Sequence, residues 1–151
     1  MKKQTVKKIT PFLWFDGQAE EAAKFYTSIF KNSKIIRSSP MMATFELEGQ
    51  QFMALNGGPY FQFTEAFSLY VRCETQKEID YFWKKLTAGG KKSRCGWLKD
   101  KFGVSWQIIP PILEELLNDD DDAKADRVRQ AMLKMDKINI QKLKQAYGKK
   151  K

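Results

Sequence analysis

Histidine is absent from this 151-residue sequence. Its absence excludes Ser-His-Asp and Cys-His nucleophilic systems and the usual zinc sites, and it removes the most common general base at neutral pH. Any catalysis must therefore use carboxylates, Tyr, Lys, Cys or backbone groups.

Cysteine and long apolar segments are also scarce. The two cysteines, Cys73 and Cys95, lack the CxxC spacing of metal and redox motifs. The chain opens with lysines but shows no signal-peptide apolar run, and nothing in it approaches the roughly 20 apolar residues of a membrane span. We therefore predict a cytoplasmic protein with reduced thiols and no membrane partner.

Aromatic and basic residues are plentiful. Aromatic residues make up 13% of the chain and hydrophobic residues 42%, which is typical of a packed globular protein and fits a single domain over residues 1–151. The 27 Lys and Arg exceed the 18 Asp and Glu, giving a net charge of +9. Many of these charges lie at the two chain ends, so we interpret them as solvated termini and keep nucleic-acid binding as the less favoured alternative.

The first half of the chain predicts the order β-α-β-β-β, over residues 8–58. The strand at 8–15 contains Pro11, which suggests an edge or a partly unpaired position. Asp16 or Gly17 is expected to cap the following helix, whose apolar residues have helical spacing up to residue 30. Three runs of period two follow at 34–38, 41–48 and 51–56, with a hairpin turn at 48–50.

The second half repeats this order over residues 66–110. A strand at 67–73 precedes a helix at 75–87, where Thr75 and Glu78 form a capping box, and short strands are predicted at 91–93, 96–99 and 104–109. The repetition indicates an α+β fold of two duplicated modules. A helical extension over 111–147 follows, with a break near 137–139, and its run Asp119–Asp122 is interpreted as helix capping rather than metal binding.

A family resemblance follows from several motifs. ITPFLWFDGQAEEAAKFY opens the first module, CGWLKDKFGVSWQIIP closes the second, and ALNGGP and FTEAFS lie between them. With these motifs the chain resembles the vicinal oxygen chelate superfamily, in its PhnB-like branch labelled 3-demethylubiquinone-9 3-methyltransferase. The resemblance implies two βαβββ modules that form a glyoxalase-like curved mixed sheet, and sites commonly built across a two-fold homodimer.

The metal positions of that superfamily can be located in this chain. The resemblance places them at Ile9, at Ala66 or a neighbour, and at Gln107. Apolar residues cannot ligate a metal, and a neutral amide substitutes weakly for a carboxylate. We therefore predict no metal and no cofactor. The methyltransferase label is taken as a family name, because the glycine pairs lack the strand-turn-helix context of a Rossmann-type cofactor site.

Strand alternation gives a candidate ligand groove. If Gln107 faces the groove, every second residue of its own strand and of the paired strands shares that face. The predicted groove residues are Leu13, Phe15, Asn56, Ser68, Tyr70, Ser105 and Gln107. The alternative is a filled core in which Gln107 and Tyr70 only satisfy each other.

We therefore predict a metal-free protein that binds a small organic ligand and forms a homodimer. The C-terminal helices pack on their own domain or are exchanged between subunits. The alternative is an enzyme of the superfamily type that acts through Gln107, Tyr70 or an acid such as Glu65. Cys95 is interpreted as an inert, half-buried thiol, because there is no histidine to activate it.

Overall fold

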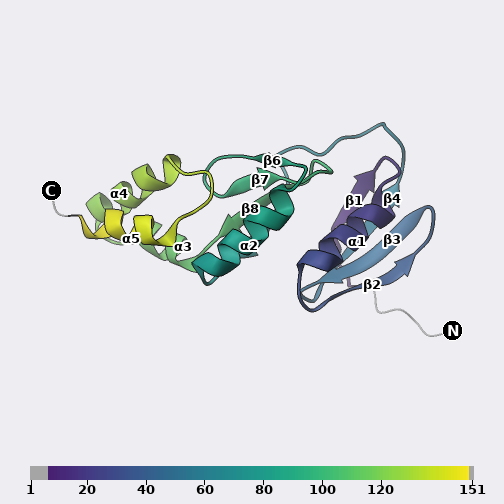
Figure 1. Ribbon diagram of the computed structural model, residues 1–151, viewed down its shortest axis with the longest axis horizontal. Helices are drawn as coiled ribbons and strands as arrows, with labels where there is room; N and C mark the ends of the chain where they lie inside the picture. The colour runs from purple at the N-terminus through teal and green to yellow at the C-terminus, as the bar shows by residue number, and fades with distance from the viewer. Residues whose placement is uncertain (1–6, 150–151) are drawn as a thin grey trace. The chain divides into compact units, whose positions relative to one another are not determined.

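The computed structural model describes residues 7–149, which form two compact units divided after Phe63 (Figure 1). Each unit contains one four-stranded mixed sheet and follows the predicted βαβββ order. The second unit also carries the three C-terminal helices. The α+β prediction is therefore confirmed, whereas the assignment of one domain to residues 1–151 stays a prediction.

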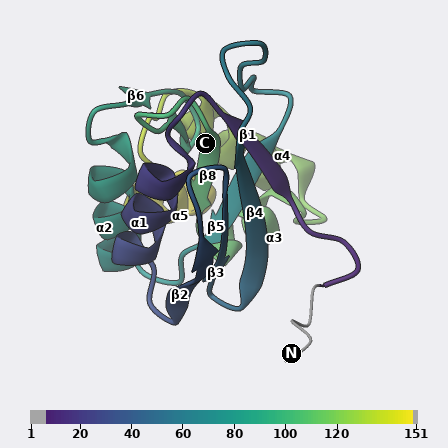
Figure 2. The ribbon, with the colours of Figure 1, turned by 90° about the vertical axis from the view of Figure 1, so that its right-hand side faces the viewer.

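Unit one has the strand order β1-β4-β3-β2. Its elements are β1 (Phe12–Phe15), α1 (Ala19–Ile29), β2 (Ser33–Ser38), β3 (Met42–Leu47) and β4 (Gln50–Asn56). Helix α1 lies along one face of this sheet (Figure 2). The buried residues of α1 include three alanines, whose small side chains let the helix approach the strands closely.

Two boundaries in unit one differ from the prediction. Strand β1 begins at Phe12 rather than at residue 8, because Pro11 has no N–H and only its carbonyl bonds to the sheet, accepting from Met53 N at 3.0 Å. Gln18, not Asp16 or Gly17, occupies the cap position of α1 and makes no side-chain cap bond. The hairpin turn between β3 and β4 is confirmed, with Glu48 and Gly49 both at positive φ.

Unit two has the equivalent strand order β5-β8-β7-β6. Its elements are β5 (Ser68–Arg72), α2 (Gln76–Thr87), β6 (Lys91–Lys92), β7 (Trp97–Lys99) and β8 (Ser105–Ile109). The predicted capping box is present: Thr75 Oγ1 accepts from Glu78 N at 3.2 Å. Helix α2 packs on β7 and β8 through four buried residues, Ile79, Phe82, Trp83 and Leu86.

The C-terminal helices α3 (Pro111–Leu117), α4 (Asp122–Leu133) and α5 (Ile140–Gly148) share a core with the end of β8. That core joins Ile109 to Leu113, Val128, Met135, Ile138 and Leu143. Asp121 caps α4, because its Oδ1 accepts from Ala123 N and Lys124 N. The capping interpretation of the aspartate run is thus confirmed. Within residues 7–149, no helix is long and apolar enough to cross a membrane.

Candidate functional site

The candidate site is one face of the unit-two sheet. Helix α2 covers the opposite face, which carries Leu98, Trp106 and Ile108. The pairing register places alternate residues of β5, β7 and β8 side by side on the remaining face. We call this surface the open face; it consists of Ser68, Tyr70, Trp97, Lys99, Ser105 and Gln107.

Gln107 lies at the centre of the open face. Its neighbours in the register are Tyr70 on β5 and Trp97 on β7. The Gln107 amide Nε2 donates a hydrogen bond to Ser68 Oγ at 2.9 Å, and the residue is partly exposed. One end of the amide is thereby oriented, while its carbonyl oxygen is available as an acceptor.

Tyr70 has a different partner from Gln107. Its hydroxyl donates to Glu114 Oε1 of α3 at 2.6 Å, and its side chain is 43% exposed. Partial burial, together with this hydrogen bond, raises the pKa of Tyr70 above its ordinary value. The alternative in which Gln107 and Tyr70 only satisfy each other is therefore wrong, since each has its own partner.

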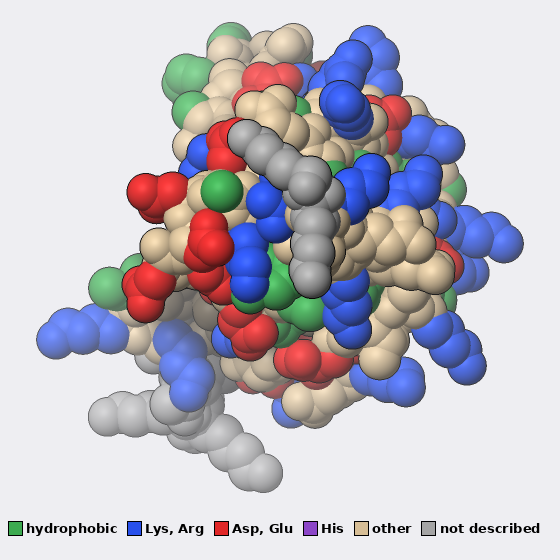
Figure 3. All heavy atoms as spheres, turned by 90° about the vertical axis from the view of Figure 1, so that its left-hand side faces the viewer, with side chains coloured by type: hydrophobic (Ala, Val, Ile, Leu, Met, Phe, Trp, Pro, Cys, Tyr) green, Lys and Arg blue, Asp and Glu red, His purple; other side chains and the backbone are tan. Residues whose placement is uncertain are grey.

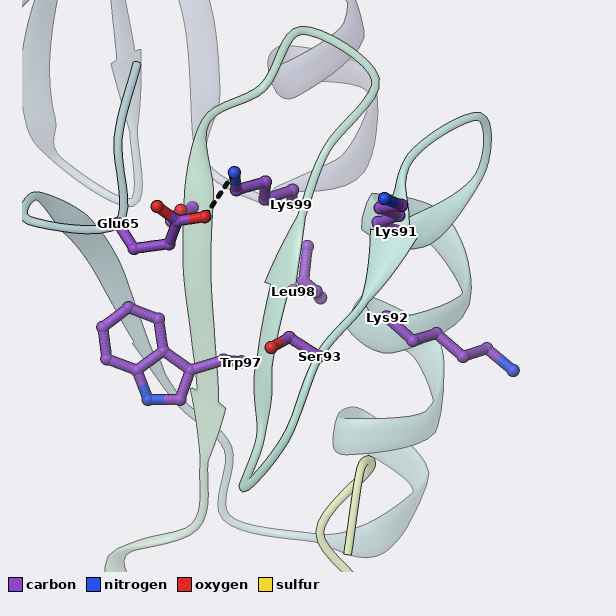
Figure 4. Close-up of a pocket in the computed structure, with 8 residues that line it drawn as sticks. Glu65, Lys91, Lys92, Ser93, Trp97, Leu98 and Lys99 are labelled. Atoms are coloured by element: carbon purple, nitrogen blue, oxygen red, sulfur yellow. Dashed lines mark ion pairs between the residues drawn. The ribbon is translucent and has the colours of Figure 1, made fainter.

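A small pocket adjoins this centre. It has a volume of about 180 Å³ and lies at the β6 and β7 end of the open face (Figure 4). Its lining residues are Glu65, Lys91, Lys92, Ser93, Trp97, Leu98, Lys99 and Ser105. Glu65 forms an ion pair with Lys99 across the pocket, and this bond lowers the pKa of the Glu65 carboxyl. Ser105 is only 1% exposed, and its Oγ is the one buried side-chain oxygen or nitrogen within residues 7–149 that has no hydrogen-bond partner.

The residues predicted for the groove in unit one have structural roles. Leu13 and Phe15 are 2% and 3% exposed and belong to the core, so the alternation on β1 is shifted by one residue from our expectation. Their neighbours Phe12 and Trp14 lie on the more exposed face. Asn56 uses both ends of its amide: Oδ1 accepts from Ala19 N at 2.8 Å, and Nδ2 donates to the Pro40 carbonyl at 2.9 Å.

The NGGP motif holds Trp14 in place. Trp14 Nε1 donates to the Gly58 carbonyl at 2.9 Å, and its ring packs edge-on against Phe61. A Cβ at Gly57 would lie 2.2 Å from the Trp14 ring, so only glycine fits there. These glycines therefore support an aromatic side chain and form no phosphate-binding turn.

The closing motif of unit two is also largely structural. Asp100 is buried and accepts from Phe102 N, Val104 N and the Trp106 indole Nε1, at 2.9, 3.1 and 2.8 Å. It shapes the turn between β7 and β8 and so sets the register that places Gln107.

The residues at the superfamily metal positions do not fit a divalent ion. Ile9 and Ala66 carry no side-chain donor atom, and Gln107 offers only a neutral amide oxygen, which is a weaker ligand than a carboxylate. In the part of the chain that the structure describes, no cluster of three or more His, Cys, Asp or Glu has metal-binding geometry. No chemical step can therefore be assigned to a metal here.

Sequence reasoning missed Trp97, Lys91 and Lys99. Trp97 and Lys99 alternate with buried Leu98 on β7, and this alternation was the available signal. The strand is only three residues long, however, so its two faces were not distinguished from the sequence.

Comparisons with known proteins agree with the fold. A family model described as 3-demethylubiquinone-9 3-methyltransferase matches residues 7–109. A PhnB protein from Bacillus cereus, described as a 3-demethylubiquinone-9 3-methyltransferase, is 42% identical; the match covers 69% of this chain and 99% of that one, with a TM-score of 0.64. No curated protein matches the chain.

More distant solved structures share the fold alone. Protein PA1353 from Pseudomonas aeruginosa is 21% identical over 70% of this chain and 98% of that one, with a TM-score of 0.57. A fosfomycin resistance protein from Listeria monocytogenes, solved with Mn(II) and sulfate, is 17% identical over 76% and 97% of the two chains, with a TM-score of 0.56. The chain thus has the fold of the glyoxalase and fosfomycin resistance class.

Proposed function

The chain belongs to the 3-demethylubiquinone-9 3-methyltransferase family, and from this premise we propose that it binds a small organic molecule on the open face without a metal. The observation that carries the proposal is the pair Gln107 and Ser68. These polar groups are oriented by each other, partly exposed, and flanked by the aromatic rings of Tyr70 and Trp97. Ligand sites typically combine apolar surfaces with a few fixed polar groups.

Acid-base catalysis has weaker support. The raised pKa of Tyr70 keeps its phenol protonated at neutral pH, and the lowered pKa of Glu65 keeps its carboxylate charged. Neither group is poised to exchange a proton near pH 7, and the amide of Gln107 does not titrate. Binding is therefore favoured over an enzyme that acts through these three residues.

Methyl transfer with a Rossmann-type cofactor site also lacks support. Such a site needs a glycine-rich turn from a strand into a helix. The Gly57–Gly58 pair follows β4 and packs around Trp14, and the Gly89–Gly90 pair ends α2. Neither pair stands at the required junction.

A melting experiment tests the binding proposal. Chelator-treated protein is screened against small organic compounds, and a binding compound should raise the melting temperature. The variant Gln107→Ala should lose most of that rise while the free protein melts near the wild-type temperature. Gln130→Ala, at an exposed position on α4, serves as the control and should keep the rise.

Two results would count against the proposal. A large drop in the melting temperature of free Gln107→Ala would assign Gln107 a structural role. A rise that appears only after a divalent metal is added would contradict the metal-independent site.

The protein is further proposed to act as a homodimer. Several large apolar side chains of unit one are exposed, among them Ile9 at 87%, Tyr60 at 78% and Phe61 at 66%. Apolar surface of this kind commonly marks a protein interface. In the structure, α3, α4 and α5 pack on unit two of their own chain.

A further inference from the structure

The pocket at the β6 and β7 end combines three features that the binding proposal does not use. An ion pair spans it, a second lysine, Lys91, also lines it, and a buried hydroxyl in its wall lacks a partner. Its volume is about 180 Å³. The size suits a small molecule or one group of a larger ligand.

The lysine side chains around the pocket point in different directions. Lys91 is directly opposite Lys99 in the β6–β7 register, so the two side chains share the open face. Lys92 is the next residue along β6, and its side chain points away from the pocket (Figure 4). The sheet therefore contributes two lysine side chains to the pocket, those of Lys91 and Lys99. Glu65 is the only carboxylate among the lining residues.

Glu65 comes from outside the sheet. It lies in the segment before β5, and its side chain is 62% exposed although it is bonded to Lys99. An exposed ion pair of this kind contributes little to stability and exchanges readily. The position of the Glu65 carboxylate thus shows where an anionic oxygen binds, and a ligand can displace this carboxylate from Lys99.

We propose that Lys99, supported by Lys91, binds the acid group of a small organic anion, and that Glu65 occupies the place of this acid group in the free protein. The inference rests on the proposed function and names its ligand class. Ser105 is directly opposite Lys99 in the β7–β8 register, so an oxygen of the acid group lies beside the unpartnered Oγ and accepts its hydrogen bond. Trp97, on the same face, offers its ring to the body of the ligand.

The test uses benzoate and its neutral analogue benzamide, titrated calorimetrically into the full-length protein. Benzoate should bind wild-type protein more tightly than benzamide does. Lys99→Gln should weaken benzoate binding by about tenfold or more, the effect of losing one charge-assisted hydrogen bond. Glu65→Gln should strengthen it, because the competing carboxylate is gone.

Lys84→Gln, at an exposed position on α2, is the matched control. It removes the same charge from the helix that covers the opposite face of the sheet, so benzoate affinity should change by less than about twofold. Melting curves of each free variant verify folding, and the partial exposure of Lys99 and Glu65 predicts that both variants fold.

The outcomes separate the two proposals. Equal weakening by Lys84→Gln and Lys99→Gln, weaker binding in Glu65→Gln, or no benzoate binding to wild-type protein would each overturn the anion assignment. If benzamide binds as well as benzoate and Gln107→Ala abolishes both, the proposed function stands and only the anion assignment fails. If benzoate depends on Lys99 but Gln107→Ala has no effect, the anion assignment stands and the Gln107 site fails.

Discussion

Asp100 is the buried acid that holds the closing hairpin of unit two together. Its two carboxylate oxygens accept from two backbone N–H groups and from the Trp106 indole. Burying a carboxylate this deeply is costly, and the three hydrogen bonds that it accepts offset that cost. The same residue therefore shapes the turn and fixes the strand that carries Gln107.

Asp100→Ala should lower the free energy of unfolding by about 3 kcal/mol or more, because it removes the acceptor of the part-buried Phe102 N–H and of the buried Val104 and Trp106 N–H groups. Urea denaturation followed by circular dichroism measures the change. Asp126→Ala is the control, since Asp126 forms only an exposed ion pair with Arg129 and should cost less than about 1 kcal/mol. Similar losses in the two variants would contradict this role of Asp100.

Cys73 makes the free energy of unfolding depend on pH in the alkaline range. Burial raises the pKa of its thiol to about 12, whereas the unfolded chain has a value near 8.5. The pKa is higher in the folded state than in the unfolded state. The stability that the neutral thiol contributes to the fold is therefore complete below about pH 8.5 and is lost as the pH rises toward 12.

Between pH 9 and 11, the free energy of unfolding of the wild type should therefore fall more steeply than that of Cys73→Ala. The difference in slope should be up to about 1.4 kcal/mol per pH unit. Urea titrations with a reductant present give both slopes. Parallel slopes would show that Cys73 ionises in the folded protein as it does in the unfolded one.

Strand alternation predicted site residues only where the two faces differ in polarity. On β8, Ser105 and Gln107 alternate with Trp106 and Ile108, and the predicted faces are correct. On β1, all four residues of Phe-Leu-Trp-Phe are apolar, so the sequence gives no sign of which face α1 covers. Leu13 and Phe15 were therefore placed on the wrong face.

Cys95 and Gly96 join the β-sheet of unit two to the C-terminal helices. Cys95 N donates to the Met135 carbonyl at 2.8 Å, and Gly96 N donates to the Asp136 carbonyl at 2.7 Å. Both residues have positive φ, and the Cys95 thiol points to the Met132 carbonyl at 3.6 Å. Cys95 thus acts through its backbone, and an inert thiol agrees with its position.

Gly96→Ala should disrupt the packing at this junction. A Cβ there would lie 2.6 Å from Ile109 Cδ1 and 2.9 Å from the Ile108 carbonyl oxygen. Gly103→Ala is the matched control, because Gly103 has a similar φ of 90° but no atom within 4 Å of the added Cβ.

The control should cost roughly 1 kcal/mol of backbone strain, and Gly96→Ala at least about 2 kcal/mol more. Chemical denaturation gives both values, and hydrogen exchange of α4 and α5 should increase only in Gly96→Ala. Equal costs in the two variants would mean that the junction adapts to the methyl group.

The order of the elements was predictable because turns, caps and hydrophobic periods agree along the chain. The contacts between elements were not predictable from the sequence. Asn56 stabilises the start of α1 from a strand 37 positions away in sequence, and no local pattern reveals such a bond. The ion pair of Glu65 with Lys99 is equally nonlocal.

The whole chain carries a net charge of +9. On the face shown in Figure 3, Lys and Arg side chains are interspersed with acidic ones. Exposed ion pairs such as Lys137 with Asp80 add to this mixture. A continuous basic stripe of the kind that tracks nucleic acid has no support on that face.

The proposed homodimer can be tested by its mass in solution. Sedimentation equilibrium at micromolar concentration should give twice the mass of 17.6 kDa. Phe61→Ser, at a side chain that is 66% exposed, should weaken association without unfolding the chain. A monomer at this concentration would contradict the proposal.

The open face is proposed to bind an organic molecule without a metal. Native mass spectrometry of chelator-treated protein tests it most directly. We expect an organic adduct of constant mass on wild-type protein, lost on denaturation and strongly reduced in Gln107→Ala. A stoichiometric divalent ion that survives the chelator, or an adduct equally abundant in Gln107→Ala, would contradict it.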